Sequence, residues 1–130
     1  MKYTSASEII EAFESSFADR HVIPYQLELV WLKKAIGRYS AELYKLNYDD
    51  EIQEFDCELD MYVIDTLAQM MKKFYQEREL SKVNKRVSIV GKDLSVDGSG
   101  QSKTAAKNEL NYVTSEVSDM VENQKPTAYV

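Results

Sequence analysis

Apolar residues recur at helical spacing over four stretches of the chain. The longest of these stretches covers residues 57–80, which contain no Gly or Pro. One apolar row in it has steps of four, four, three and four residues: Leu59, Val63, Leu67, Met70 and Phe74. A second apolar row lies beside the first: Met61, Ile64, Met71 and Tyr75. We therefore expect a central helix that contacts neighbours on more than one side.

Two further helices are predicted before this one. Ser5 and Glu8 have the capping-box spacing, in which each residue satisfies an amide at the start of a helix. Pro24 suits the first turn of a second helix, over residues 24–46, because a proline there loses no intrahelical hydrogen bond. The apolar positions of that helix form a heptad-like seam: Leu29, Leu32, Ile36, Tyr39, Leu43 and Leu46. Within the seam, Gly37 indicates either close approach of a neighbouring backbone or a tolerated surface glycine.

The pattern changes after residue 80. Val83, Val87 and Ile89 lie on one face of an alternating pattern, and a glycine turn follows, so a β-hairpin is predicted over about residues 81–97. Residues 97–102 are predicted to form a flexible turn. The last helix should begin near residue 102, with apolar positions three or four residues apart: Leu110, Val113, Val117 and Met120.

The fold class expected from this order is mainly α. We predict one helical domain over residues 1–122, a small bundle of about four helices with the β-hairpin projecting between the third and last helices. Residues 123–130 should form an extended C-terminal tail. An isolated hairpin is marginally stable in water, so a neighbouring element or a second copy of the protein should cover it.

Charge divides the 130-residue chain into two unequal parts. The chain has 22 acids and 16 bases, a formal net charge of -6, which argues against free binding to DNA or to an anionic membrane. Residues 1–80 contain sixteen acids and nine bases, whereas residues 81–130 contain six acids and seven bases. The two parts should therefore attract one another, within a chain or between copies. With no signal peptide and no apolar run of membrane-spanning length, a cytoplasmic protein is expected.

Acidic residues are densest in the connection at residues 47–60, which contains no base. They are Asp49, Asp50, Glu51, Glu54, Asp56, Glu58 and Asp60. One interpretation is a solvated connection whose last acids favour the N-terminus of the central helix through its dipole. Another is an acidic surface for a basic partner. A metal site is the third, although the acids lack the spacing and turn glycine of an EF-hand.

Candidate catalytic groups are scarce. The single histidine, His21, lies at the expected end of the first helix, where a capping or surface role is the simpler interpretation. Cys57 is flanked by Asp56 and Glu58, whose charges should raise the pKa of its thiol and make it a poor nucleophile. One cysteine excludes an intrachain disulfide, and together with one histidine it excludes the common zinc spacings. We therefore expect no enzymatic activity, no metal and no cofactor.

Five segments together suggest a family. They are the helices over residues 29–46 and 59–80, the basic segment 81–89, the last helix over 110–120, and the end of the chain at 125–130. Their order resembles that of the head-tail connector, or adaptor, proteins of tailed bacteriophages. The long acidic connection departs from the shorter members of that family.

The resemblance implies a virion protein without enzymatic activity, made in the bacterial host cytoplasm. It would form a ring of copies under the portal protein and join the DNA-filled head to the next neck or tail-completion protein. The hairpin would contact the neighbouring subunit through Lys82, Lys85, Arg86, Val87 and Ile89. The C-terminal segment would dock on the portal through Thr127, Ala128, Tyr129 and Val130.

Charge suggests the other side of the contact between copies. A head-to-tail ring joins two different patches, and the acidic patch would comprise Asp49, Asp50, Glu51 and Glu54. Excess acid would also let DNA pass through the ring without specific binding. A head-completion role next to the adaptor position fits the same pattern. Two other classes stay open: a small cytoplasmic helical regulator that binds a partner protein through the seam at residues 29–46, and an enzyme.

Overall fold

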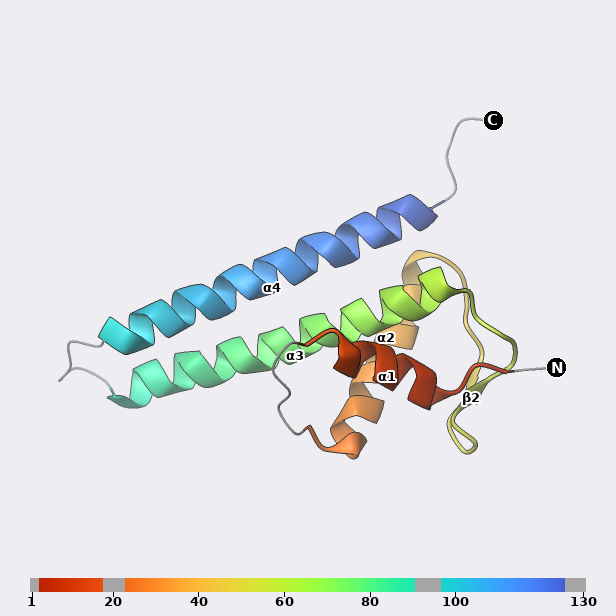
Figure 1. The fold of residues 1–130 in the computed structure, drawn as a ribbon, viewed down its shortest axis with the longest axis horizontal. Helices are drawn as coiled ribbons and strands as arrows, with labels where there is room; N and C mark the ends of the chain where they lie inside the picture. The colour runs from red at the N-terminus through yellow and green to blue at the C-terminus, as the bar shows by residue number, and fades with distance from the viewer. Residues whose placement is uncertain (1–2, 18–22, 91–96, 126–130) are drawn as a thin grey trace.

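The structure is a computed structural model that describes residues 3–17, 23–90 and 97–125, with side chains outside 85–90 and 97–103. Its helices are α1 (Ala6–Ser15), α2 (Tyr25–Glu42), α3 (Met61–Val90) and α4 (Asp97–Gln124). Two short strands, β1 (Tyr48–Asp49) and β2 (Glu54–Phe55), lie between α2 and α3. The fold is mainly helical, as predicted. Figure 1 shows α4 running along one side of α3, α1 on the opposite side, and α2 crossing behind α3.

Helix α3 is the central element, and it contacts α1, α2 and α4. Its first predicted apolar row is buried throughout, and Ile64, Met71 and Tyr75 of the second row are buried as well. Burial of both rows explains how one helix packs against three others. Met61, the first residue of the helix, is an exception because 71% of it is exposed.

Helix α1 begins where the capping box predicts. The Ser5 amide donates a hydrogen bond to the Glu8 carboxylate at 2.8 Å, which is the glutamate half of that motif. Farther along α1, Phe13 is fully buried, and its ring lies edge-on to Trp31 of α2 and Tyr75 of α3, with centroids 6.1 and 6.4 Å away. This aromatic cluster joins three helices.

Helix α2 turns its predicted seam toward the protein's own core. Leu32, Ile36 and Tyr39 are buried, while Leu29 and Leu43 are partly buried and pack against the core. The helix ends at Glu42, four residues earlier than predicted. A Cβ atom added at Gly37 would have no neighbour within 4 Å, so this residue is a surface glycine and the close-approach interpretation is wrong.

The prediction of a β-hairpin at residues 81–97 is wrong, because residues 81–90 are helical and the observed strands lie earlier in the chain. Residues 81–90 form the last part of α3, and residues 97–102, predicted as a turn, belong to α4. Residues 91–96 lie outside the described part of the chain. Extension of an existing helix gains a hydrogen bond for each added residue, whereas an isolated hairpin is marginally stable. The observed antiparallel pair lies in the acidic connection, with Tyr48 opposite Phe55 and Asp49 opposite Glu54.

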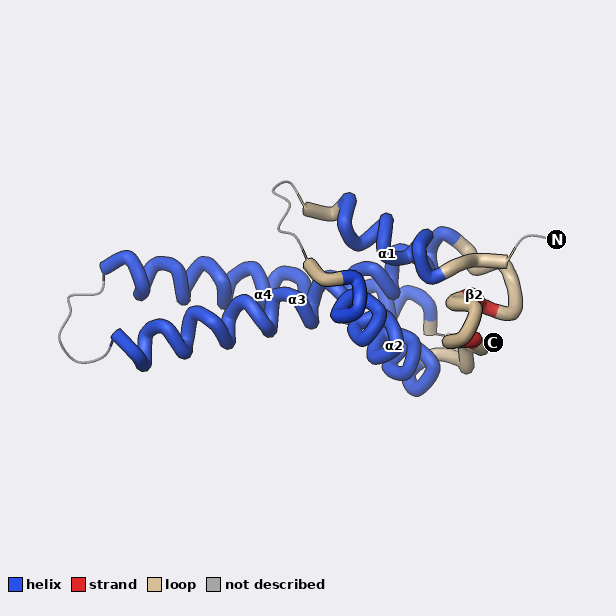
Figure 2. The backbone as a smooth tube through the Cα atoms, turned by 90° about the horizontal axis from the view of Figure 1, so that it is seen from below, coloured by secondary structure: helices blue, strands red, loops and turns tan. Residues whose placement is uncertain are grey.

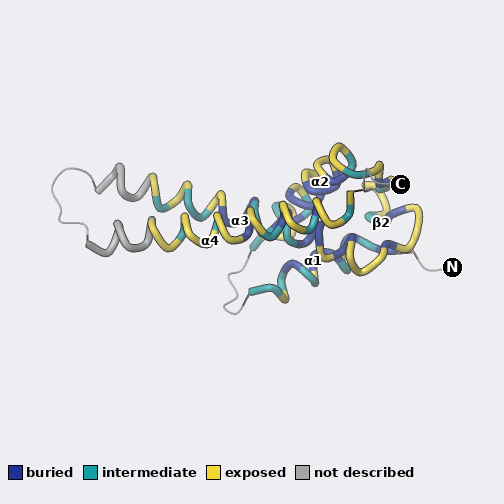
Figure 3. Tube along the Cα trace, turned by 90° about the horizontal axis from the view of Figure 1, so that it is seen from above, coloured by how far each residue is buried: buried dark blue, intermediate teal, exposed yellow. Residues whose placement is uncertain are grey.

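The distal part of α3 and the facing part of α4 form a two-helix arm, which we define as residues 77–90 and 97–112. Helix α3 has 30 residues, a length of about 45 Å. Figures 1 and 2 show the arm extending beyond α1 and α2, and Figure 3 shows that burial decreases along it. Among the described side chains of α4, only Val113, Val117 and Val121 are buried. The predicted contacts Leu110 and Met120 are half-buried.

Candidate protein-interaction site

The acidic connection has a defined backbone rather than a loose one. The Phe55 amide donates to the Thr4 carbonyl at 2.8 Å, and the Ala6 amide donates to the Gln53 carbonyl at 2.8 Å. The buried Thr4 hydroxyl also accepts a hydrogen bond from the Leu59 amide at 2.8 Å. The N-terminal segment therefore lies beside β2 and fixes the connection between α2 and α3.

The turn between β1 and β2 exposes carboxylates. Asp49 accepts a hydrogen bond from the Glu51 amide at 2.9 Å, the local contact by which aspartate favours turns. Gln53 has a φ of 55°, in the left-handed region that non-glycine residues seldom adopt. The side chains of Asp49, Asp50 and Glu51 are exposed, and Glu54 is half-buried. The interpretation of residues 47–60 as a solvated connection fits these side chains. It does not fit the backbone, which hydrogen bonds hold in place.

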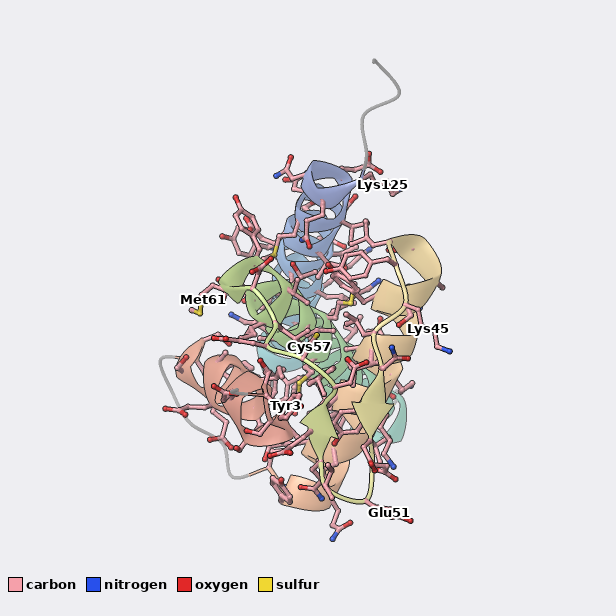
Figure 4. The ribbon with its side chains drawn as sticks, turned by 90° about the vertical axis from the view of Figure 1, so that its right-hand side faces the viewer. Tyr3, Lys45, Glu51, Cys57, Met61 and Lys125 are labelled. Atoms are coloured by element: carbon pink, nitrogen blue, oxygen red, sulfur yellow. The ribbon has the colours of Figure 1, made fainter. Side chains whose placement is uncertain are left out.

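An open groove of about 730 Å³ lies beside this turn. We call it the hairpin groove and define it by its lining residues: Tyr3, Lys45, Leu46, Asn47, Tyr48, Asp49, Asp50, Ile52, Glu54, Phe55 and Asp56. Aromatic and aliphatic side chains line it together with four carboxylates and one ammonium group. Figure 4 views this end of the molecule and labels Tyr3 and Lys45 of the groove, with Glu51 at the turn.

The carboxylates of the groove differ in their partners. Asp50 forms an ion pair with Lys33 at 2.9 Å, and both side chains are largely exposed. Asp56 accepts a hydrogen bond from the Asn47 amide group at 3.1 Å. The Glu54 carboxylate has no hydrogen bond or ion pair within the described part of the chain. With four acids and one lysine, the groove has a negative potential that favours a cationic ligand.

Tyr48 lines the groove, but its hydroxyl oxygen is shielded from solvent. Its ring packs against Phe55 with centroids 5.1 Å apart. Its hydroxyl oxygen is buried and has no hydrogen-bond partner among the described residues. Burial, and then the negative charge of Asp50, raises the pKa of the Tyr48 phenol to about 12, because both disfavour the phenolate. The hydroxyl therefore stays neutral at physiological pH and can accept a hydrogen bond.

A second arrangement of polar groups fixes the end of α4. The Tyr39 hydroxyl donates to Gln124 Oε1 at 2.8 Å, and Gln124 Nε2 donates to the Thr66 hydroxyl at 2.7 Å and to the Met120 carbonyl at 2.9 Å. Tyr39 and Thr66 are fully buried. We call this set of three side chains the α4 latch, because it ties α4 to α2 and α3. Desolvation by burial, with a smaller contribution from Tyr44, raises the pKa of the Tyr39 phenol.

The latch was not foreseen. No local signal in the sequence connects Tyr39, Thr66 and Gln124, because they are far apart in the chain. Three exposed apolar side chains near the end of α2 and the start of α3 were not foreseen either: Tyr44, Met61 and Tyr62.

The structure places the two predicted contact patches between copies at opposite ends of α3. Asp49, Asp50, Glu51 and Glu54 lie near its start, whereas residues 82–89 lie near its end (Figure 1). Lys82 is exposed, and its Nζ atom lies 3.3 Å from Oε1 of Glu79. Residues 85, 86, 87 and 89 belong to α3, but their side chains lie outside the described set. The predicted docking residues 127–130 and His21 also lie outside the described part.

The described residues include no group of three or more His, Cys, Asp or Glu side chains that could hold a metal ion. Cys57 is exposed, and partial desolvation followed by its hydrogen bond to Asp56 raises the pKa of its thiol. The raised pKa is the direction predicted, although the second charge that contributes is Asp60 rather than Glu58.

No helix in the described ranges is both long enough and apolar enough to cross a membrane. Comparison with known proteins finds no matching family model, no matching curated protein and no matching solved structure.

Proposed function

We propose that the protein is a structural head-tail adaptor of a tailed bacteriophage or prophage. It forms a ring under the portal protein and joins the DNA-filled head to the neck or tail. The observation that supports this most is the separation of a packed helical core from a long two-helix arm, whose described side chains are exposed or half-buried. An arm of this kind offers a surface to neighbouring molecules.

The distribution of charge supports contact between copies. The acidic patch and the basic segment at residues 82–86 lie at opposite ends of α3, so they do not meet within one copy. Two different patches on one chain make a heterologous contact, and such contacts close into a ring when the rotation between copies allows. The proposed contact residues are Lys82, Lys85, Arg86, Val87 and Ile89 on one side and Asp49, Asp50, Glu51 and Glu54 on the other.

The α4 latch supports a docking role for the end of the chain. It fixes Gln124 to α2 and α3, so residues 125–130 begin from a defined point on the core. We propose that residues 127–130 bind the portal protein. In this role the protein has no enzymatic activity and needs no cofactor, and its acidic surface lets DNA pass through the ring without specific binding. Its place is the head-tail junction of the virion.

The structure offers less support for the helical regulator. That function depends on the seam of α2 as a partner-binding surface, but Leu32, Ile36 and Tyr39 of the seam are buried by the protein's own helices. A partner would have to displace this packing first.

Mass photometry with the portal protein of the same phage tests the proposal. The full chain should add a ring of copies to the portal, and a chain that ends at Gln124 should not. The truncated chain keeps the latch, so its circular dichroism and thermal unfolding should match those of the full chain. The absence of a complex with the full chain would contradict the adaptor role. Rings from both chains would contradict the docking role of the tail.

A further inference from the structure

We infer that the hairpin groove is the binding site for the basic end of α3 of a neighbouring copy, with a lysine or arginine side chain entering the groove. The inference rests on the proposed function, because it identifies which two surfaces meet in the ring. The chemistry of the groove and the position of the basic residues both support it.

The residues that line the groove suit a long cationic side chain. Tyr3, Ile52 and Phe55 provide apolar surface for the methylene stem of a lysine or arginine. Asp49 and Glu54 provide carboxylates for the charged head, which forms stronger hydrogen bonds with ionised acceptors than with neutral ones. The volume of about 730 Å³ lies within the range of ligand-binding pockets.

The chain itself contains a segment with the required chemistry. Residues 80–92 carry four cations and no acid: Lys82, Lys85, Arg86 and Lys92. Residues 80–90 of this segment do not reach the groove of their own copy, because α3 is a continuous helix of about 45 Å and the groove lies near its other end. A second copy brings the two surfaces together, with the charge complementarity that orients a heterologous contact.

Disulfide capture between full-length variants detects the contact even when it is weak. In a Cys57→Ser background, one variant carries Ile52→Cys in the groove and a second, tagged variant carries Asn84→Cys on the arm; both positions are exposed. Mild oxidation of the mixture should form this cross-link about tenfold faster than a control pair, because the contact raises the effective concentration of the two thiols. The control pair combines Asn84→Cys with Gly37→Cys, an exposed site with free space around it. Equal rates would overturn the inference.

Charge reversal in this protein, followed by its assembly on the portal, separates this inference from the adaptor role. Lys82→Glu with Arg86→Glu should prevent ring formation, and so should Asp49→Lys with Glu54→Lys. All four changes in one chain should restore the ring, because each contact then joins the reversed charges. Glu109→Lys with Asp119→Lys, on exposed positions of α4, adds the same positive charge away from the groove and should leave the ring intact.

Failure of the adaptor role and failure of this inference would give different experimental results. If the unaltered protein forms no complex with the portal, the adaptor role fails, while disulfide capture still measures the contact between copies. If rings form with each reversed pair alone, the inference fails and the adaptor role stands.

Discussion

The two halves of α3 lie in different surroundings. From Val63 to Gln76 the helix is enclosed by α1, α2 and α4, and most of its side chains are buried. From residue 77 to residue 84 every side chain is exposed or half-buried (Figure 3). One continuous helix therefore serves first as the centre of a core and then as half of an arm.

This difference separates the part of the protein that provides stability from the part that is free to contact other molecules. Apolar burial is the main stabilising contribution in folded proteins, and here it is concentrated around the first half of α3. Regions with few buried contacts open at lower cost than the core. The core should therefore determine stability, and the arm and the hairpin groove should determine assembly.

The largest effect should follow from a cavity in the core. Leu67 is fully buried, so Leu67→Ala should lower the free energy of unfolding by about 2–5 kcal/mol. Leu110→Ala removes the same atoms from the half-buried arm and should cost about 1 kcal/mol or less. Urea unfolding followed by circular dichroism measures both. Equal losses would mean that the arm contributes as much to stability as the core.

A smaller loss is expected when the α4 latch is broken. Tyr39→Phe removes the hydroxyl that donates to Gln124 and leaves its carbonyl oxygen unsatisfied, so unfolding should become easier by about 1–3 kcal/mol. Hydrogen exchange should accelerate in the last turns of α4 more than in α1. Tyr112→Phe, at a side chain that is 60% exposed, serves as the control. Faster exchange in both helices alike would show that the latch is not specific to α4.

Alkaline pH should weaken the region around the hairpin groove. The Tyr48 phenol has a pKa near 10 in the unfolded chain and about 12 in the folded protein, so the unfolded state releases its proton first. Stability should therefore fall as the pH rises from about 10 to about 12. Tyr48→Phe should make this fall shallower and leave stability at neutral pH nearly unchanged. Tyr112→Phe on the exposed arm is the control, and an equal change in both variants would contradict the prediction.

The smallest effects should come from the surface ion pairs. The Lys33–Asp50 pair lies beside the groove and the Lys82–Glu79 pair lies on the arm. Lys33→Ala and Lys82→Ala should each change the free energy of unfolding by less than about 1 kcal/mol, because exposed pairs are well hydrated. Urea unfolding at low and high salt measures this. A larger, salt-dependent loss at Lys33 alone would mean that its ion pair holds the turn in place.

Local signals predicted the helices and much of the core. The capping box marks the start of α1, and the two apolar rows of α3 correspond to buried faces except at Met61. These signals succeed because helical periodicity reflects which side of a helix meets apolar neighbours. The same logic failed at Val83, Val87 and Ile89, where alternate spacing indicated a strand but α3 continues to Val90.

The candidate site was predicted only in part. The acidic side chains of the connection were recognised from their density in the sequence, and four of them line the hairpin groove. Strands β1 and β2 were missed because each has two residues, too few for an alternating pattern to be recognised. The groove was missed because Tyr3 lies far from Tyr48 in the chain and reaches it through the pairing of Thr4 with Phe55.

The sequence by itself determined that four helices form, which of their faces are apolar and how charge divides between the two parts of the chain. These properties depend on residues within a few turns of one another, which a linear pattern records. The tertiary structure decided that the seam of α2 is internal, that the end of α3 is helical, and that Tyr39, Thr66 and Gln124 meet. Those outcomes depend on which surfaces from distant segments pack together, and packing is a property of the whole chain.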